Sequence, residues 1–140
     1  MKVLMFTTHL NVGGVSTYVV TLAKYLKQKG VDVVCASGGG RLVPELDKCG
    51  IKHYEVPIIT KSELHIKLFF CFLKLIEIIN AEEITIIHAH TRVSQLVAHW
   101  LRKVCDIRCV TTCHGFYKRR LGRFLIPAWG EKVVAISDPV

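Results

Sequence analysis

Histidines and glycines stand at the ends of three apolar runs in this sequence. Gly13-Gly14 follows the first run, His90 closes the second, and His114-Gly115 closes the third. In an open parallel sheet, ligands bind in the crevice beyond the carboxyl ends of the strands. These residues are therefore the first candidates for a binding or catalytic site.

The Gly13-Gly14 pair points to an anion. Glycine lets the backbone approach a ligand closely, and the N–H groups at the start of a following helix favour a phosphate. The stretch Gly13-Gly14-Val15-Ser16-Thr17 has neither the Gly-x-Gly-x-x-Gly spacing of dinucleotide-binding proteins nor the Gly-Lys-Ser/Thr of a phosphate loop. The sequence therefore argues against NAD binding and against a P-loop ATP site.

The histidines differ in what they indicate. His88 and His90 are two residues apart on a predicted strand, so they face the same side and could bind a metal or a hydroxylated ligand. For His88, earlier in the strand, a structural role is favoured, whereas for His90 both roles stay open. His114 is favoured as functional, because Gly115 leaves the backbone beside it open and Thr112 adds a hydroxyl.

The six cysteines predict neither a disulfide framework nor a metal site. Cys35, Cys71, Cys109 and Cys113 lie in apolar runs, where a reduced cysteine behaves as a small hydrophobic residue. Cysteines spaced by three residues precede His114, but the Cys-x2-Cys spacing of structural zinc sites is absent. We expect reduced core cysteines, no bound metal and a cytoplasmic protein without a secretory signal.

The formal net charge of +8 raises the question of an anionic partner. The densest basic cluster is Lys118-Arg119-Arg120 with Arg123, and it lies outside any recognisable nucleic-acid-binding module. We therefore expect no nucleic-acid partner. The cluster either forms a solvated face or contacts an anionic group such as a membrane surface.

Hydrophobic periodicity predicts alternating strands and helices. The predicted strands are Lys2–Thr7, Asp32–Ser37, Ile51–Val56, Ile84–Ala89, Arg108–Cys113 and Lys132–Ile136. The predicted helices are Val15–Gly30, Leu42–Cys49, Leu64–Asn80 and Val93–Val104. Alternation of this kind, with continuously apolar strands, predicts an α/β domain whose mostly parallel sheet has helices on both faces.

The helix predicted over Leu64–Asn80 is apolar on nearly all sides. Only Lys67, Lys74 and Glu77 form a narrow polar stripe. The segment is too short and too charged to span a bilayer, and its lysines do not make a broad basic face. We expect it to pack against the sheet rather than lie on a membrane surface.

Four motifs in order resemble the N-terminal half of GT-B glycosyltransferases, most closely the retaining family 4. They are Gly13-Gly14 with Val19-x2-Leu22-Ala23-x2-Leu26-x3-Gly30, Ile86-Ile87-His88-Ala89-His90, Val110-Thr111-Thr112-Cys113-His114-Gly115, and Val134-Ala135-Ile136-Ser137. The sequence departs from many relatives at Ser16, where an acid is frequent, and at Val31, where histidine is common.

The resemblance implies a Rossmann-like half that mainly holds the acceptor, facing a C-terminal half that mainly holds a nucleotide-sugar. It implies that Gly13 and Gly14 approach the donor diphosphate and that His114 contacts the transferring sugar as the catalytic residue. The residues implied to bind substrate are His9, His90, Arg92, Thr112 and Tyr117. In retaining members a donor phosphate oxygen takes the acceptor proton, so this half needs no carboxylate base.

The donor-binding Arg/Lys pair and Glu-x7-Glu motif of such enzymes are not found in residues 1–140. The resemblance therefore implies a second GT-B half, in cis or in trans, and no turnover by residues 1–140 alone. It implies a nucleotide-sugar co-substrate, no other cofactor, and a glycan or lipid-linked acceptor, as in cell-envelope polysaccharide synthesis.

The basic cluster and adjoining aromatic residues suit anionic head groups, which predicts peripheral attachment at the inner face of the membrane. Two alternatives to a hexosyltransferase stay open. One is a non-catalytic sugar-phosphate or lipid-binding module, and the other is half of a GT-B UDP-sugar epimerase.

Overall fold

The computed structural model describes residues 1–60, 65–115 and 128–136. Its centre is a parallel sheet of six strands in the order β3-β2-β1-β4-β5-β6. The strands are β1 (Lys2–Phe6), β2 (Asp32–Ser37), β3 (His53–Glu55), β4 (Ile86–Ala89), β5 (Arg108–Cys113) and β6 (Lys132–Ala135). This order is that of a Rossmann-like sheet, and it confirms the predicted fold class.

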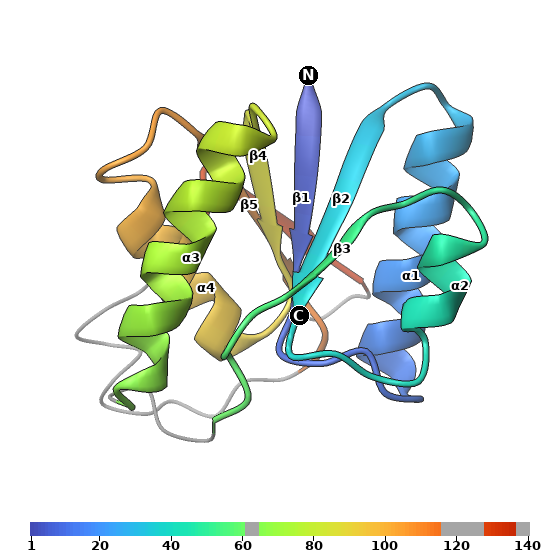
Figure 1. Ribbon diagram of the computed structural model, residues 1–140, viewed down its shortest axis with the longest axis horizontal. Coiled ribbons are helices and arrows are strands. Elements are labelled where there is room, and N and C mark those ends of the chain that lie inside the picture. The colour runs from blue at the N-terminus through green and yellow to red at the C-terminus, as the bar shows by residue number, and fades with distance from the viewer. Residues whose placement is uncertain (61–64, 116–127, 137–140) are drawn as a thin grey trace.

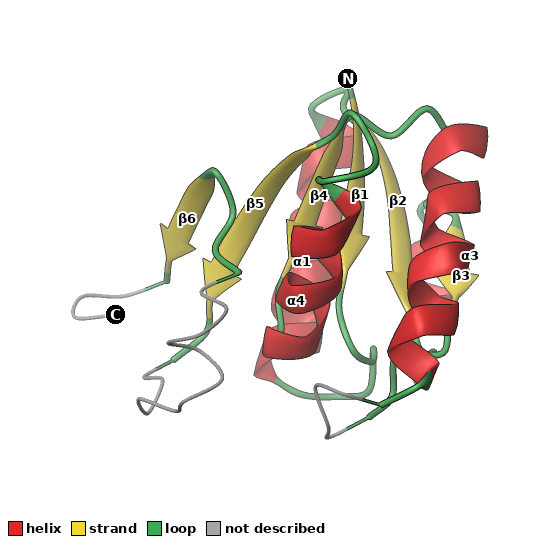
Figure 2. Ribbon diagram, turned by 90° about the vertical axis from the view of Figure 1, so that its left-hand side faces the viewer, coloured by secondary structure: helices red, strands yellow, loops and turns green. Residues whose placement is uncertain are grey.

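Helices cover both faces of the sheet (Figures 1 and 2). The helices are α1 (Gly14–Gln28), α2 (Val43–Asp47), α3 (Lys67–Ala81) and α4 (Arg92–Leu101). α1 and α2 lie on one face, and α3 and α4 lie on the other. Right-handed crossovers from β1 outward to β3, and then from β3 back to β4, account for this division.

Alternate residues of the central strands feed two separate cores. In β1, Val3 and Met5 pack toward Val19 and Ala23 of α1, while Leu4 and Phe6 face the α3 and α4 side. A strand buried on both faces needs apolar residues at every position, which is why its sequence shows no alternation. The buried cysteines Cys35, Cys71, Cys109 and Cys113 belong to these cores or adjoin them, as predicted.

β3 and β4 each begin two residues later than predicted, because the residue predicted to start each strand closes the preceding helix. The Ile51 N–H donates to Leu46 O at the end of α2, so Ile51 is not part of β3. Likewise the Ile84 N–H donates to Ile79 O at the end of α3, next to Glu83 in the left-handed region (φ 52°). Both isoleucines are buried, and an apolar pattern alone cannot separate a helix-closing residue from a strand residue.

α3 is buried on one side only. Leu68, Cys71, Leu75, Ile78 and Ile79 pack against the sheet and α4, which confirms the predicted packing of this segment. Its opposite side exposes large apolar residues, which the sequence analysis did not predict. In the described part of the chain, no helix is long and apolar enough to cross a membrane.

Candidate functional site

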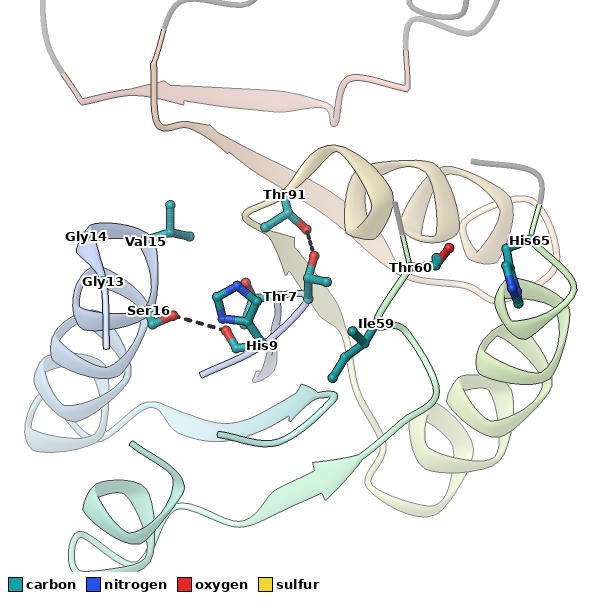
Figure 3. Close-up of a pocket in the computed structure, with 11 residues that line it drawn as sticks. Thr7, His9, Gly13, Gly14, Val15, Ser16, Ile59, Thr60, His65 and Thr91 are labelled. Atoms are coloured by element: carbon teal, nitrogen blue, oxygen red, sulfur yellow. Dashed lines mark hydrogen bonds between the residues drawn. The ribbon is translucent and has the colours of Figure 1, made fainter. Parts of the chain in front are cut away.

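A cavity of about 710 Å³ opens at the carboxyl ends of β1 and β4. This is the point where the strand order reverses, and it is the place where open α/β sheets bind ligands. Figure 3 shows that the residues lining it come mainly from the loop after β1, the start of α1 and the segment before α3. The cavity is lined by Thr7, Thr8, His9, Gly13, Gly14, Val15, Ser16, Ile59, Thr60, His65 and Thr91.

The loop after β1 is held in place by the glycine-rich loop after β2. The Leu10 N–H donates to Gly39 O at 2.8 Å, and the Leu42 N–H donates to Leu10 O at 2.9 Å. Gly40 has a φ of +146°, and a Cβ there would overlap the Leu10 and Asn11 backbone. The glycines after β2, Gly38, Gly39 and Gly40, therefore position this wall of the cavity.

Gly40→Ala is expected to destabilise the fold by about 2 kcal/mol or more, because it combines an unfavourable φ with a backbone overlap. Gly50→Ala is the matched control, since Gly50 also has a positive φ (+63°) but no atom lies within 4 Å of its added Cβ. It should cost about 1 kcal/mol. Urea unfolding measures both, and equal losses would contradict the tight contact at Gly40.

Gly13 and Gly14 leave the start of α1 open toward the cavity. No atom lies within 4 Å of a Cβ added at either residue, and no side chain caps the helix at Gly13. The φ of Gly13 is 164°, an extended conformation, so the pair is needed for access rather than for a strained turn. The first turn of α1 also contains no acidic residue, which leaves its N–H groups and positive dipole end available to an anion.

Short polar contacts join the two walls of the cavity. The Ser16 hydroxyl donates to His9 O at 3.1 Å, which fixes the loop after β1 to α1 (Figure 3). The hydroxyl of Thr8, in the loop after β1, is 2.7 Å from the hydroxyl of Thr91, which directly precedes α4. Thr91 also caps α4, because its hydroxyl accepts from Ser94 N and the Ser94 hydroxyl accepts from Thr91 N.

Three histidines form a cluster beside the cavity. Met5 of β1 pairs in register with His88, so His88 and His90 are on the α1 side of β4, as their spacing predicts. Their ring centroids are 4.2 Å apart. His90 Nδ1 is 3.3 Å from His114 Nε2, and Tyr18 of α1 contacts both of these rings edge-on.

Burial keeps the histidine cluster neutral near pH 7. Burial, with a smaller contribution from His114, lowers the pKa of His88 to about 4. Burial and the two neighbouring histidines hold the pKa of His90 well below its usual value, and burial lowers the pKa of the half-buried His114. A neutral imidazole can donate one hydrogen bond and accept another, which suits it to sugar hydroxyls.

The cluster lies one turn of α1 away from the rim of the cavity. Tyr18 comes four residues after Gly14 and three after Val15, and residues at these spacings share a helix face. His90 directly precedes Thr91, which lines the cavity. The described residues thus bring together the sites that the sequence suggested at the ends of β1, β4 and β5.

The structure places the predicted site residues at different depths. His9, Gly13 and Gly14 line the cavity. His90 and Thr112 are buried, and Thr112 Oγ1 is 2.7 Å from His88 Nε2. Arg92 is the first residue of α4. The remaining predicted site residues, Tyr117, Lys118, Arg119, Arg120 and Arg123, lie outside the described residues.

Several lining residues were missed by the sequence analysis. Thr91 could have been found from Thr91-x-x-Ser94, a helix-capping pattern at the end of a predicted strand. Thr7 lines the cavity, and its buried hydroxyl has no hydrogen-bond partner among residues 1–60, 65–115 and 128–136. Ile59, Thr60 and His65 carry no local signal, because they reach the cavity only through the fold. In the same ranges, no group of three or more His, Cys, Asp or Glu residues could hold a metal ion.

A family model and a solved structure both identify this chain as similar to glycosyltransferases. Residues 12–140 match the model of Glycosyltransferase Family 4. No curated protein sequence matches the chain. A glycosyltransferase structure from Rickettsia africae has a TM-score of 0.77 and 27% identity, covering 96% of this chain and 36% of that one.

Two more distant structures share the fold. MurG of Acinetobacter baumannii has a TM-score of 0.66 and 13% identity, covering 96% of this chain and 45% of that one. HepE of Anabaena in complex with UDP has a TM-score of 0.64 and 17% identity, covering 84% and 30%. The chain thus spans less than half the length of each of these proteins.

Proposed function

The chain belongs to glycosyltransferase family 4, and from this premise we propose that it forms the acceptor-binding half of an enzyme that transfers a sugar from a nucleotide-sugar. The cavity between β1 and β4 would hold the reacting groups. A second half, in the same chain or another, would hold most of the nucleotide. This chain covers less than half of each related structure, which supports a division of the enzyme into two halves.

The observation that carries the proposal is the open start of α1. Gly13 and Gly14 bring bare backbone to the cavity, and the uncapped helix end favours a negative charge there. A diphosphate is an anion that a nucleotide-sugar would place at this point. The hydroxyls of Thr8 and Thr91, and His9 beside them, provide hydrogen-bonding groups for a sugar on the opposite wall.

His114 would hydrogen-bond the transferring sugar. It is the most accessible of the three clustered histidines, and Gly115 beside it leaves open space. His90 and Tyr18 hold its ring from two sides. As positive charge develops at the anomeric carbon, a neutral imidazole that bonds to a sugar hydroxyl can stabilise the transition state.

Gly14→Val tests the diphosphate site, because a Cβ added at Gly14 meets no atom within 4 Å and the valine side chain would extend into the space proposed for the ligand. UDP is the first probe, since the Anabaena relative was solved with it. Titration of the isotope-labelled chain with UDP should shift the amide NMR signals of Gly14, Val15 and Ser16. Gly14→Val should weaken UDP binding by about tenfold or more.

Thr17→Val is the matched control. Thr17 is exposed on the same helix but does not line the cavity, so the variant should bind UDP like the wild type. Circular dichroism should give unchanged melting for Gly14→Val. UDP shifts confined to other regions, or undiminished binding by Gly14→Val, would refute the diphosphate site.

A further inference from the structure

The contact between His90 and His114 is a hydrogen bond whose direction determines what His114 can bind. His90 Nδ1 is 3.3 Å from His114 Nε2. Burial lowers the pKa of both rings, so each is neutral near pH 7 and has one N–H and one bare nitrogen. Only one of the two facing nitrogens can therefore carry a proton, and that choice fixes the tautomer of both rings.

The second ring nitrogen of His90 distinguishes the two directions. His90 Nε2 is buried and has no hydrogen-bond partner among residues 1–60, 65–115 and 128–136. If His114 donated, the proton of His90 would lie on Nε2, as a buried N–H without an acceptor. If His90 donates, its proton lies on Nδ1, and Nε2 keeps only a lone pair. Buried N–H groups without acceptors are rarer in proteins than under-used acceptors, so donation by His90 is favoured.

The side chains around His90 hold its ring in place. His90 is 1% exposed, the ring centroid of His88 lies 4.2 Å away, and Tyr18 of α1 contacts the ring edge-on. His88 is anchored in turn, because its Nε2 is 2.7 Å from Thr112 Oγ1. His114 is only half-buried and directly follows the last residue of β5. His90 is thus the fixed member of the pair, and His114 is the member that a ligand can reach.

We propose that His90 is a positioning residue, whose Nδ1–H donates to His114 Nε2 and thereby holds the proton of His114 on Nδ1. The two nitrogens of an imidazole point in different directions, so Nδ1 is the ring nitrogen of His114 that remains for a ligand. It offers a proton and no lone pair. The ligand group at His114 is therefore an oxygen that accepts a hydrogen bond, such as that of a sugar hydroxyl.

The role of this donor in catalysis rests on the proposed function. When the bond to the diphosphate breaks, positive charge develops at the anomeric carbon and negative charge develops on the departing oxygen. A sugar hydroxyl that accepts from His114 Nδ1–H becomes a stronger donor itself, because hydrogen bonds in a chain polarise one another. Through such a hydroxyl, His114 would stabilise the departing phosphate oxygen in the transition state.

Long-range proton–nitrogen NMR spectra of the isotope-labelled chain test the tautomers, because a protonated ring nitrogen and a bare one resonate far apart. At about pH 7.5, where histidines are neutral, we expect both His114 and His90 to carry the proton on Nδ1 and to have a bare Nε2. In water, by contrast, a free histidine side chain mainly carries its proton on Nε2. The spectra need no substrate, so their result is independent of the glycosyltransferase assignment, which the UDP titration tests.

Two variants of His90 separate positioning from folding. In H90N the side-chain amide keeps an N–H close to the place of Nδ1, whereas H90L fills similar space without a donor. H90N should leave the proton of His114 on Nδ1, and H90L should move most of it to Nε2. In the complete enzyme, H90L should lower kcat by about tenfold at nearly unchanged KM, the worth of one neutral hydrogen bond, and H90N should recover most of this loss.

V33A is the matched control for lost stability. Val33 is buried in the core on the α1 side but belongs to β2, so V33A should lower the melting temperature and leave the His114 tautomer and kcat unchanged. A wild-type spectrum with the His114 proton on Nε2 would overturn the proposal. So would an H90L enzyme in which the proton moves and kcat stays normal while His114→Ala loses activity, because His114 would then act without His90. Circular dichroism checks that the variants fold.

Discussion

From the proposed role of His114, we expect His114→Ala to lower kcat of the complete enzyme by about 10²–10³-fold, the usual loss when a group that stabilises transition-state charge is removed. The KM for both substrates should change little, because in this proposal the imidazole contributes mainly as charge develops. The half-buried position of His114 means that alanine leaves the fold largely intact. Steady-state kinetics with the two halves present measure the effect, and thermal melting checks stability.

His88→Ala and His99→Ala separate catalysis from folding. His88 is buried and bonded to Thr112, so its replacement should mainly lower the melting temperature. His99 lies on α4 away from the cavity, and its replacement should leave kcat unchanged. If His114→Ala kept a normal kcat and only melted earlier, the histidine at the end of β5 would be structural, and a non-catalytic binding module would be favoured.

The free energy of unfolding falls as the pH is lowered from 7 to 5, because the clustered histidines are neutral in the folded protein. The unfolded chain takes up protons below a histidine pKa of about 6.5, whereas the folded protein does not protonate His88 until about pH 4. The contribution of His88 to the free energy of unfolding is therefore fully present above pH 6.5, and it is lost as the pH falls toward 4. His88 alone accounts for about 2 kcal/mol between pH 7 and 5.

The other histidines with a lowered pKa change stability in the same direction as His88, whereas Glu82 acts below the range of pH 7 to 5. The lowered pKa values of His90 and His114, and of His53 and His99 elsewhere, add to the loss. Hydrogen bonds from Lys2, Lys52 and Tyr54 lower the pKa of Glu82 to about 2, so its contribution is lost only below about pH 4.5.

Urea unfolding between pH 7 and 5 gives the slope, and a His88→Gln/His90→Gln variant should reduce it. NMR titration of the wild-type histidines measures their pKa values directly, even if that variant does not fold. A pKa near 6.5 for His88 would contradict the buried, neutral cluster.

The sheet and its helices could be predicted because burial on two faces leaves a strong trace in the sequence. β1 and β2 are apolar at consecutive positions, and α1 repeats apolar residues at Val15, Val19 and Leu22 before ending near Gly30. The carboxyl-end rule then located Gly13 and Gly14 at the cavity, and the family resemblance added His9. The spacing of His88 and His90 placed both rings on one side of β4.

What could not be predicted depends on contacts between segments distant in the sequence. Nothing near Thr8 indicates that its hydroxyl meets Thr91, 83 residues later. Ile59 and His65 lie in the segment between β3 and α3, and only the folded position of this segment brings them to the cavity. The apolar residues of α3 look alike in sequence, and only the packed sheet decides that Leu75 is buried and Phe70 exposed.

The bond between the loop after β1 and the glycines after β2 matters for protein engineering. Leu10 bonds to Gly39 and Leu42, and its backbone leaves no room for a side chain at Gly40. A chimera should therefore exchange residues 7–13 and 38–42 together, because either segment transplanted alone would meet a partner shaped for another sequence.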